Sequence, residues 1–140
     1  MEKKYVKLPN GETYAYVEKG GGNQNLILIH GNVSSSLYYL PLLDRLPSTI
    51  HAYAMDLRGY GDSSYHNRFN SLKELAEDVA LFMETLSIKS GVIVGWSLGG
   101  GVAMEFAAHH PDKTEKLVLI ESTTHKGYPV FKKDEKGQMV

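Results

Sequence analysis

The sequence predicts an α/β protein whose mostly parallel sheet is covered by helices on both faces. Short apolar segments alternate with segments of helical periodicity over most of the chain. Such alternation is typical of parallel strands joined by right-handed helical crossovers. The composition, with 42% hydrophobic and 22% charged residues, is that of a globular protein. At 140 residues the chain is long enough for one core and too short for two ordinary domains.

The first strands of the predicted sheet form an antiparallel hairpin. Residues 5–8 and 13–18 are extended in character, and the Pro-Asn-Gly between them is a turn signal. A glycine-rich break at 20–23 then leads to residues 26–29, a continuous apolar run. Because strands that are buried on both faces have this pattern, we expect the run to be the central strand.

Two helices and a strand are predicted next. Residues 37–46 have helical character although Pro41 lies inside the segment, and residues 50–55 have the pattern of a strand. Residues 72–86 repeat apolar side chains at helical spacing, and Ser71 with Glu74 forms a capping box in front of them. This pattern predicts an amphipathic helix that packs one face onto the sheet.

A strand, a helix and another strand follow. We expect a strand at 92–94, then a glycine-rich corner and a helix at 98–109, and finally a strand at 116–120. Beyond residue 121 the chain is polar and has no clear periodicity. We therefore expect residues 1–121 to belong to one core, and residues 122–140 to be the start of a cap or a connecting segment.

The charge balance and the cysteine content exclude several classes of function. The 15 basic and 16 acidic side chains leave a net charge of −1, which favours neither nucleic acid nor a membrane as a partner. The count of 0 cysteines excludes disulfides, thiolate metal sites and a cysteine nucleophile. The charged first residues do not resemble a signal peptide, and no apolar run approaches the roughly 20 residues that span a bilayer. We expect a cytoplasmic protein that uses no cofactor and no metal.

The strongest functional signal is the Gly-Trp-Ser-Leu-Gly sequence at 95–99, between a predicted strand and a predicted helix. A G-x-S-x-G in this context is a nucleophile elbow, in which a strained turn lifts the serine hydroxyl above the sheet. The flanking segments of such a turn approach too closely for side chains at Gly95 and Gly99. The alternative is an ordinary tight turn with an incidental serine. We expect Ser97 to be a catalytic nucleophile.

A second signal is the His-Gly-Asn at 30–32, directly after the predicted central strand. Enzymes with a nucleophile elbow place a second oxyanion donor at this position. We expect the main-chain N–H of Asn32 to act with that of Leu98 in stabilising a negative oxygen. His30 is a conceivable base, but a histidine that closes a buried strand is more often structural. The serines at 34–36 are expected to cap the following helix rather than to compete as nucleophiles.

A third signal is the Asp-Leu-Arg-Gly-Tyr-Gly-Asp-Ser-Ser sequence at 56–64. Its glycines and short polar side chains suit a tight, hydrogen-bonded loop. In enzymes with a nucleophile elbow the acid and the histidine follow the serine in the chain, whereas Asp56 precedes Ser97. We therefore expect structural roles for Asp56 and Arg58.

Together, HGNVSSS, DLRGYGDSS and GWSLGGG resemble the α/β-hydrolase superfamily in order and approximate spacing, from residue 5 to residue 121. The sequence looks most like small bacterial hydrolases with a helical cap, and its elbow is similar to that of some intracellular polyhydroxybutyrate depolymerases. The resemblance implies an eight-stranded sheet, a cap inserted after the sixth strand, and a catalytic acid and histidine beyond the cap. By this resemblance the chain is the amino-terminal half of such an enzyme, truncated after about the sixth strand.

The base and the acid that would activate Ser97 have few candidates in the chain. His109 and His110 should lie at the far end of the helix that follows Ser97, which at about 1.5 Å per residue is too distant. His125 is the histidine within reach, although the resembled family has no base at that position. Glu121 ends a predicted strand where some members carry the acid, and a structural or cap-anchoring carboxylate is the alternative.

These signals predict a carboxylic-ester hydrolase that acts on a small-molecule ester through an acyl-enzyme on Ser97. A serine at the elbow argues against dehalogenase and epoxide-hydrolase chemistry, for which similar families use aspartate. A haloperoxidase-like enzyme or a carbon–carbon bond hydrolase would keep the same serine. The alternative from another class is an inactive fragment or a ligand-binding relic. Besides the ester substrate, we expect a missing C-terminal half as a partner of the chain. Tyr38, Tyr39 and Trp96 either line the pocket or belong to the core.

Overall fold

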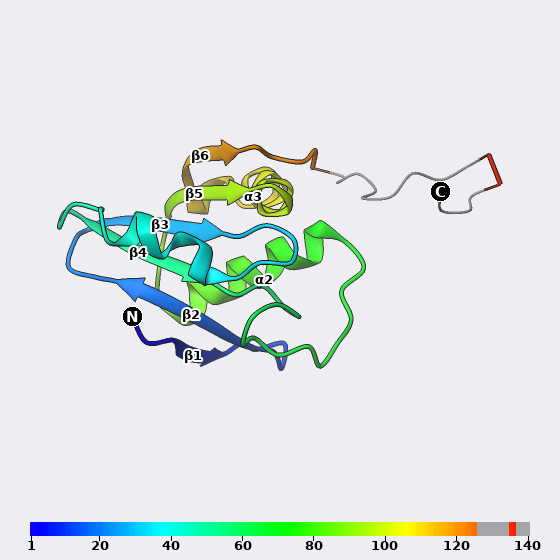
Figure 1. Cartoon of the computed structure of the whole chain (residues 1–140), viewed down its shortest axis with the longest axis horizontal. Helices are drawn as coiled ribbons and strands as arrows, with labels where there is room; N and C mark the ends of the chain where they lie inside the picture. The colour runs from blue at the N-terminus through cyan, green and yellow to red at the C-terminus, as the bar shows by residue number, and fades with distance from the viewer. Residues whose placement is uncertain (126–134, 137–140) are drawn as a thin grey trace.

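The computed structural model describes residues 1–125 and 135–136 of the chain. Its strands are β1 (Lys4–Lys7), β2 (Thr13–Lys19), β3 (Gln24–Ile29), β4 (Ile50–Met55), β5 (Gly91–Trp96) and β6 (Thr114–Ile120). In this part of the chain they form one six-stranded sheet in the order β1-β2-β4-β3-β5-β6 (Figure 1). Strands β3 to β6 run parallel, and β1 and β2 form the predicted antiparallel hairpin. Because β3 lies between β4 and β5, the prediction of a central strand is confirmed.

Helices cover both faces of the sheet, as predicted. On one face lie α2 (Leu72–Thr85) and α3 (Leu98–His109), which pack against each other (Figure 1). The other face is covered by a short 3-10 segment, η1 (Ser36–Tyr39), and by α1 (Leu40–Leu43). A second 3-10 turn, η2 (Pro111–Lys113), leads into β6.

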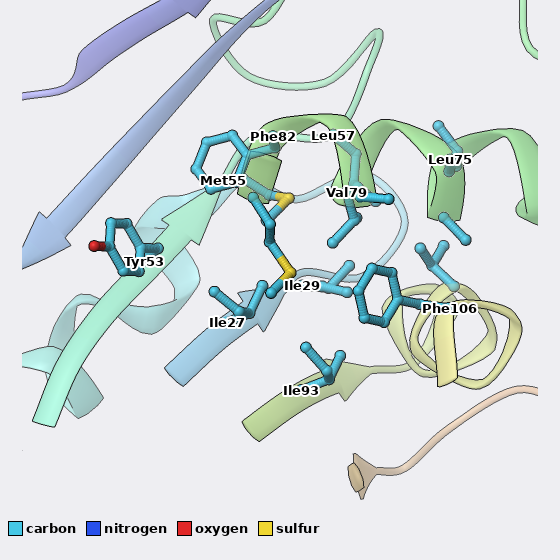
Figure 2. Packing of buried hydrophobic residues seen from close by; sticks show 14 of the residues in the cluster. Ile27, Ile29, Tyr53, Met55, Leu57, Leu75, Val79, Phe82, Ile93 and Phe106 are labelled. Carbon is cyan, nitrogen blue, oxygen red and sulfur yellow. The ribbon is translucent and has the colours of Figure 1, made fainter. Parts of the chain in front are cut away.

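Alternate residues of the central strand β3 face opposite sides of the sheet. Ile27 and Ile29 belong to the apolar cluster that α2 and α3 cover, together with Val79 and Phe106 (Figure 2). Leu28 belongs to the cluster on the opposite face, with side chains of η1 and α1. Each side chain of this size contributes about 1.5–3 kcal/mol when it is fully buried. Burial on both faces explains the continuous apolar run in the sequence.

The predicted helical segment over residues 37–46 is confirmed only in part. The segment forms η1 followed by a single helical turn, α1, which ends at Leu43. A continuous helix from residue 37 needs an N–H at position 41, and Pro41 has none. The proline instead lies in the first turn of α1, where an N–H would have no intrahelical acceptor. Ser35 caps η1 by accepting a hydrogen bond from the Leu37 N–H at 3.2 Å, as expected for the serine run.

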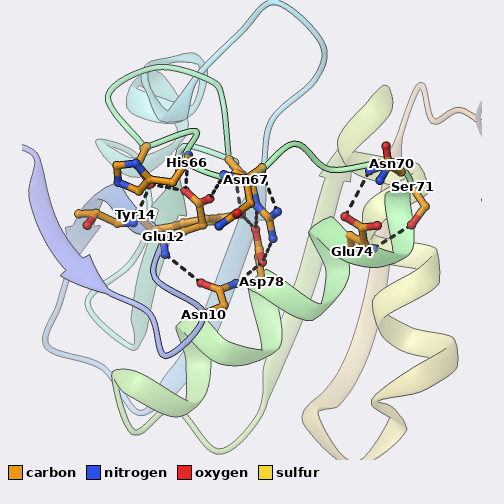
Figure 3. Close-up of polar contacts among 12 residues, drawn as sticks. Asn10, Glu12, Tyr14, His66, Asn67, Asn70, Ser71, Glu74 and Asp78 are labelled. Carbon is orange, nitrogen blue, oxygen red and sulfur yellow. Dashed lines mark hydrogen bonds and ion pairs between the residues drawn. The ribbon is translucent and has the colours of Figure 1, made fainter.

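Helix α2 begins where the capping signal predicts. The Ser71 hydroxyl accepts a hydrogen bond from the Glu74 N–H at 3.2 Å (Figure 3). The Glu74 carboxylate accepts from the N–H of Asn70, also at 3.2 Å, whereas a standard capping box uses the N–H of Ser71. The return bond is therefore shifted by one residue, and the start of the helix is unchanged.

Strand β6 is an edge of the sheet in the described part of the chain. Among the described strands it pairs with β5 alone. Its four consecutive apolar side chains at 117–120 are 36–43% exposed. An edge strand with exposed apolar side chains is a template for pairing with another strand.

The predicted cap or connecting segment at 122–140 lies outside the described residues, apart from 122–125 and 135–136. The division of the chain at residue 121 therefore stays a prediction. Within the described ranges, no helix is long and apolar enough to cross a membrane.

Candidate active site

Ser97 occupies a strained turn between β5 and α3. Its backbone has φ 53° and ψ −118°, a region that residues other than glycine rarely adopt. The residue follows Trp96, which ends β5, and precedes Leu98, which begins α3. Its side chain is only partly buried. This combination of context and conformation is that of a nucleophile elbow.

Close packing of backbone explains the glycines on either side of Ser97. A Cβ atom at Gly95 would lie well under 3.0 Å from the Gly99 carbonyl. A Cβ atom at Gly99 would collide in the same way with the carbonyl oxygens of Ile29 and His30, at the end of β3. Because these obstacles are backbone atoms, they do not move aside as the end of a flexible side chain does. Both positions therefore require glycine, as the sequence predicts.

The backbone of Ser97 is held by β6 and by the segment that follows it. The Ser97 N–H donates to the Ile120 carbonyl at 3.0 Å. The Ser97 carbonyl accepts from the N–H of Gly100 at 2.9 Å and from that of Thr123 at 3.1 Å. A strained conformation persists only when its surroundings determine it, and these hydrogen bonds supply that constraint.

The predicted oxyanion donors belong to the two segments that meet at the elbow. Leu98 is the first residue of α3, and the first N–H groups of a helix have no intrahelical acceptor. The loop after β3 approaches closely, since a Cβ atom on Gly31 would lie 3.2 Å from the Ser97 Cβ. Asn32, the next residue of that loop, is exposed, and its side-chain oxygen accepts a hydrogen bond from the Tyr60 hydroxyl at 2.8 Å. The fold therefore brings Asn32 and Leu98 to the same end of the sheet as Ser97.

His30 is buried, and both nitrogens of its ring are engaged. Nδ1 lies 2.7 Å from the Gly31 carbonyl, and Nε2 lies 2.9 Å from the Leu57 nitrogen. Since a carbonyl only accepts and a backbone N–H only donates, the contacts assign the proton to Nδ1 of a neutral ring. Burial lowers the pKa of His30, although the Gly31 carbonyl and the Asp56 charge act in the opposite direction. These contacts give His30 the structural role that we expected.

His109 and His110 lie at the end of α3 that is opposite to Ser97. His109 Nδ1 donates to the Glu105 carbonyl at 2.8 Å. His110 Nε2 lies 3.0 Å from the Glu77 carboxylate of α2. His109 is the last residue of α3 and His110 follows it, whereas Ser97 precedes the first residue. This placement agrees with the expectation that neither histidine reaches the serine.

Glu121 and His125 lie beyond β6. Glu121 directly follows the strand, is exposed, and has φ 43°. His125 is exposed at the end of the first described range. Within the described residues, neither side chain forms a hydrogen bond with Ser97. Their roles as acid and base therefore stay predictions.

Asp56, directly after β4, joins three segments of the chain. Its carboxylate accepts hydrogen bonds from the N–H groups of Ser36 at 2.7 Å and Asp62 at 2.9 Å, and it pairs with the Lys3 ammonium at 2.6 Å. Burial would raise the pKa of Asp56, but the hydrogen bonds from Asp62, Lys3 and Ser36 outweigh it and hold the pKa below its usual value. The carboxylate is therefore charged and has the structural role that we expected.

Arg58 forms a buried, bidentate ion pair with Asp78 of α2. Its Nε and Nη2 donate to the two carboxylate oxygens at 2.9 and 2.7 Å. The same carboxylate accepts from the Tyr14 hydroxyl at 2.7 Å and from the Asn10 amide at 2.8 Å (Figure 3). Arg58 thus ties the loop after β4 to α2, Asp78 ties α2 to the hairpin, and Arg58 has the predicted structural role. In the part of the chain that the structure describes, no group of three or more His, Asp or Glu side chains is arranged to hold a metal ion.

The three aromatic residues of the prediction have different positions. Tyr39 is buried, and its hydroxyl donates to the Ile29 carbonyl at 2.8 Å, so this residue belongs to the core. Tyr38 is 45% exposed and stacks on the Trp96 ring, with centroids 4.0 Å apart and planes 5° from parallel. The stacked pair adjoins the elbow, because Trp96 directly precedes Ser97. A role in lining a pocket stays a prediction for Tyr38 and Trp96.

Tyr60 is a residue of this region that the sequence analysis did not single out. It belongs to the loop after β4, and its hydroxyl reaches Asn32 across 28 residues of sequence. The available signal was a tyrosine between two glycines, at 59 and 61, in a polar loop. That pattern indicates a tight turn, but it carries no information about which distant residue the hydroxyl meets.

Comparison with known proteins identifies the family. Residues 24–138 match the family described as alpha/beta hydrolase fold. With the sheet, the covering helices and the elbow in place, the chain belongs to the α/β-hydrolase family. Solved esterases and hydrolases share its fold, among them a marine microorganism esterase with a TM-score of 0.71 and 30% identity.

Two curated relatives and a further solved structure show how much of a longer protein the chain covers. The chain is 34% identical to the dihydrolipoyllysine-residue acetyltransferase component of the acetoin cleaving system of Cupriavidus necator, over 79% of this chain and 30% of that protein. It is 37% identical to the pimeloyl-[acyl-carrier protein] methyl ester esterase of Neisseria meningitidis, over 76% and 34%. A bacterial membrane phospholipase A matches with a TM-score of 0.82 and 32% identity, over 87% and 40%. The chain thus spans about a third of the length of the curated relatives.

Proposed function

We propose that Ser97 is the nucleophile of a carboxylic-ester hydrolase whose reaction passes through an acyl-enzyme. The observation that carries the proposal is the strained backbone of Ser97 between β5 and α3, with glycines packed against backbone on both sides. Such strain costs about 1–3 kcal/mol and is concentrated at functional sites. The similarity to a pimeloyl-[acyl-carrier protein] methyl ester esterase supports an ester as the substrate.

In the proposed reaction the Ser97 oxygen attacks the carbonyl carbon of the ester while a base takes the hydroxyl proton. The main-chain N–H groups of Asn32 and Leu98 donate to the negative oxygen of the tetrahedral intermediate. The intermediate then expels the alcohol, which receives the proton from the base, and the acyl group stays on Ser97. A water molecule that the same base activates releases the carboxylic acid and restores the serine.

We place the base and the acid in polypeptide outside the described residues. Both ring nitrogens of His30 are engaged, and His109 and His110 lie at the far end of α3. The additional length of the curated relatives is large enough to supply both groups. For the base, the alternative within the chain is His125, which lies after β6.

Labelling with a fluorophosphonate tests the nucleophile. In the polypeptide that carries the base and the acid, we expect the probe to modify Ser97 and no other serine, as mass spectrometry of the digested protein will show. Residues 1–140 alone should hydrolyse p-nitrophenyl acetate no faster than their Ser97→Ala variant, because an unactivated hydroxyl is a poor nucleophile.

Two results would contradict the proposal. Modification of a serine at 34–36, or full activity of Ser97→Ala in the longer polypeptide, would remove Ser97 from the reaction. Serine-dependent turnover by residues 1–140 that His125→Ala abolishes would instead make His125 the base.

A further inference from the structure

The hydroxyl of Tyr60 connects the loop after β4 to the loop that carries the proposed oxyanion donor. It donates to the Asn32 Oδ1 at 2.8 Å. The proposed function uses the main-chain N–H of this same Asn32. A hydrogen bond to the Asn32 side chain therefore restricts the residue whose N–H must point at the oxyanion.

The Tyr60 end of this contact is rigid. The ring is partly buried, packs against the main apolar cluster, and meets the His30 ring edge to face with centroids 5.2 Å apart. Burial is the main cause that raises the pKa of Tyr60, and the neighbouring Tyr65 raises it further. The hydroxyl therefore keeps its proton at neutral pH and stays a hydrogen-bond donor.

The turn that carries Tyr60 is itself fixed on a buried charge. Gly61 has φ 53°, and a Cβ atom there would collide with the Asp56 carboxylate. The same carboxylate accepts from the N–H of Asp62 and pairs with Lys3. The Tyr60 N–H closes the turn by donating to the Leu57 carbonyl at 2.9 Å. These contacts restrain the backbone of the turn, and they therefore restrict the position of the Tyr60 hydroxyl.

At the other end of this hydrogen bond, Asn32 is held by fewer contacts than Tyr60. Val33, the next residue, has φ 51° and is 91% exposed. A β-branched residue in the left-handed region is strained, and an exposed side chain has no packing to hold it there. On the other side of Asn32, Gly31 lies against the Trp96 ring. The hydrogen bond from Tyr60 is thus a main restraint on Asn32 itself.

We propose that Tyr60 is a positioning residue, which holds the Asn32 N–H in the geometry of the oxyanion hole. This inference rests on the proposed function and adds a residue to it. Tyr60 does not touch the reacting atoms and acts through Asn32. An oxyanion donor must lie about 2.7–3.1 Å from the developing charge, so even a small displacement of the N–H weakens it.

Steady-state kinetics on the polypeptide that carries the base and the acid tests this role. Tyr60→Phe removes the hydroxyl and keeps the ring, and Asn32→Ala removes the acceptor and keeps the N–H. We expect each to lower kcat about three- to tenfold, the range for loss of one partly exposed hydrogen bond, with KM within about twofold. The double variant should lose no more than either single variant. Asn32→Pro, which removes the N–H, should lower kcat by about 10²–10³-fold.

Tyr65→Phe is the matched control, because it deletes a hydroxyl from the same loop on a residue that is 52% exposed. Its kcat should stay within about twofold of the parent protein, and the unfolding temperature of Tyr60→Phe should match that of Tyr65→Phe. An unchanged kcat in Tyr60→Phe, or losses that multiply in the double variant, would overturn the positioning role. Turnover that survives Ser97→Ala would show instead that the proposed function, and this inference with it, is wrong.

Discussion

His30 shows at the scale of single residues how burial decides what a side chain can do. The ring accepts the Leu57 N–H through Nε2, and only the neutral form of the ring can accept there. Protonation would break that bond and place a charge in the core. His30 is therefore a neutral bridge between the ends of β3 and β4.

Stability should depend on His30 in mildly acidic solution. Because its pKa is lower in the folded protein than the value of about 6.5 in an unfolded chain, the unfolded state binds more protons below that pH. The contribution of His30 to the free energy of unfolding is thus complete above about pH 6.5. It is lost as the pH falls toward the pKa of the folded state, and the loss is at most about 1.4 kcal/mol per pH unit.

Urea unfolding at pH 7.5 and 5.5 measures this effect. The difference between the two unfolding free energies should be smaller in His30→Asn than in the parent protein. His66→Asn, at an exposed histidine, should leave the difference unchanged. An unaltered pH dependence in His30→Asn would show that burial of this ring does not govern acid stability.

At the scale of elements, the elbow depends on how closely α3 approaches the end of β3. The approach is set by Gly99, which lies against the Ile29 and His30 carbonyls. Tight contact at this point brings the start of α3 and the loop after β3 to one place. The same contact therefore serves packing and the proposed oxyanion hole together.

Gly99→Ala should destabilise the protein by about 3 kcal/mol, the upper part of the range for overpacked sites, because its methyl group meets backbone. Gly20→Ala is the matched control, since its Cβ meets only the His51 ring at 3.1 Å. We expect that variant to stay within about 1 kcal/mol of the parent protein in urea unfolding. Equal losses in the two variants would mean that the close approach at Gly99 is not a constraint.

At the scale of the whole molecule, β6 is the strand whose unpaired edge can bind a further strand. It is an edge of the described sheet with four exposed apolar residues at 117–120, and its end holds the Ser97 N–H through the Ile120 carbonyl. Pairing or disorder at this strand is therefore transmitted directly to the elbow. Natural edge strands commonly carry lysine, which opposes pairing with another chain.

Residues 1–140 by themselves should associate through this edge. Val118→Lys should reduce the association, measured by sedimentation velocity over a range of protein concentrations. Leu42→Lys is the control, because Leu42 is an exposed apolar residue of α1 and is 39% exposed against 43% for Val118. If both lysine variants reduced association equally, general surface hydrophobicity and not the β6 edge would be responsible.

Local signals in the sequence predicted much of this architecture. The Pro-Asn-Gly turn, the apolar run at 26–29 and the capping serine Ser71 each depend on neighbours within a few residues, and each element was found close to its expected place. The helical segment over 37–46 was confirmed in part: it forms a 3-10 segment and one α-helical turn that ends at Leu43, because Pro41 has no N–H for a continuous helix. The strained turn at Ser97 was predictable because a G-x-S-x-G between a strand and a helix is the pattern of a turn whose flanking segments approach too closely for side chains.

The sequence by itself determined the order of strands and helices, the family motifs and the position of the elbow. Only the tertiary structure decided that Lys3 meets Asp56 across 53 residues and that Tyr60 meets Asn32 across 28. It also decided that β6 is left as an exposed edge in the described sheet. The physical reason is range, because turns, caps and periodicity express preferences between near neighbours. The Lys3–Asp56 contact instead arises when β1 pairs with β2 and β2 pairs with β4. The Tyr60–Asn32 contact arises when β3 and β4 pair and place the loops at their ends side by side.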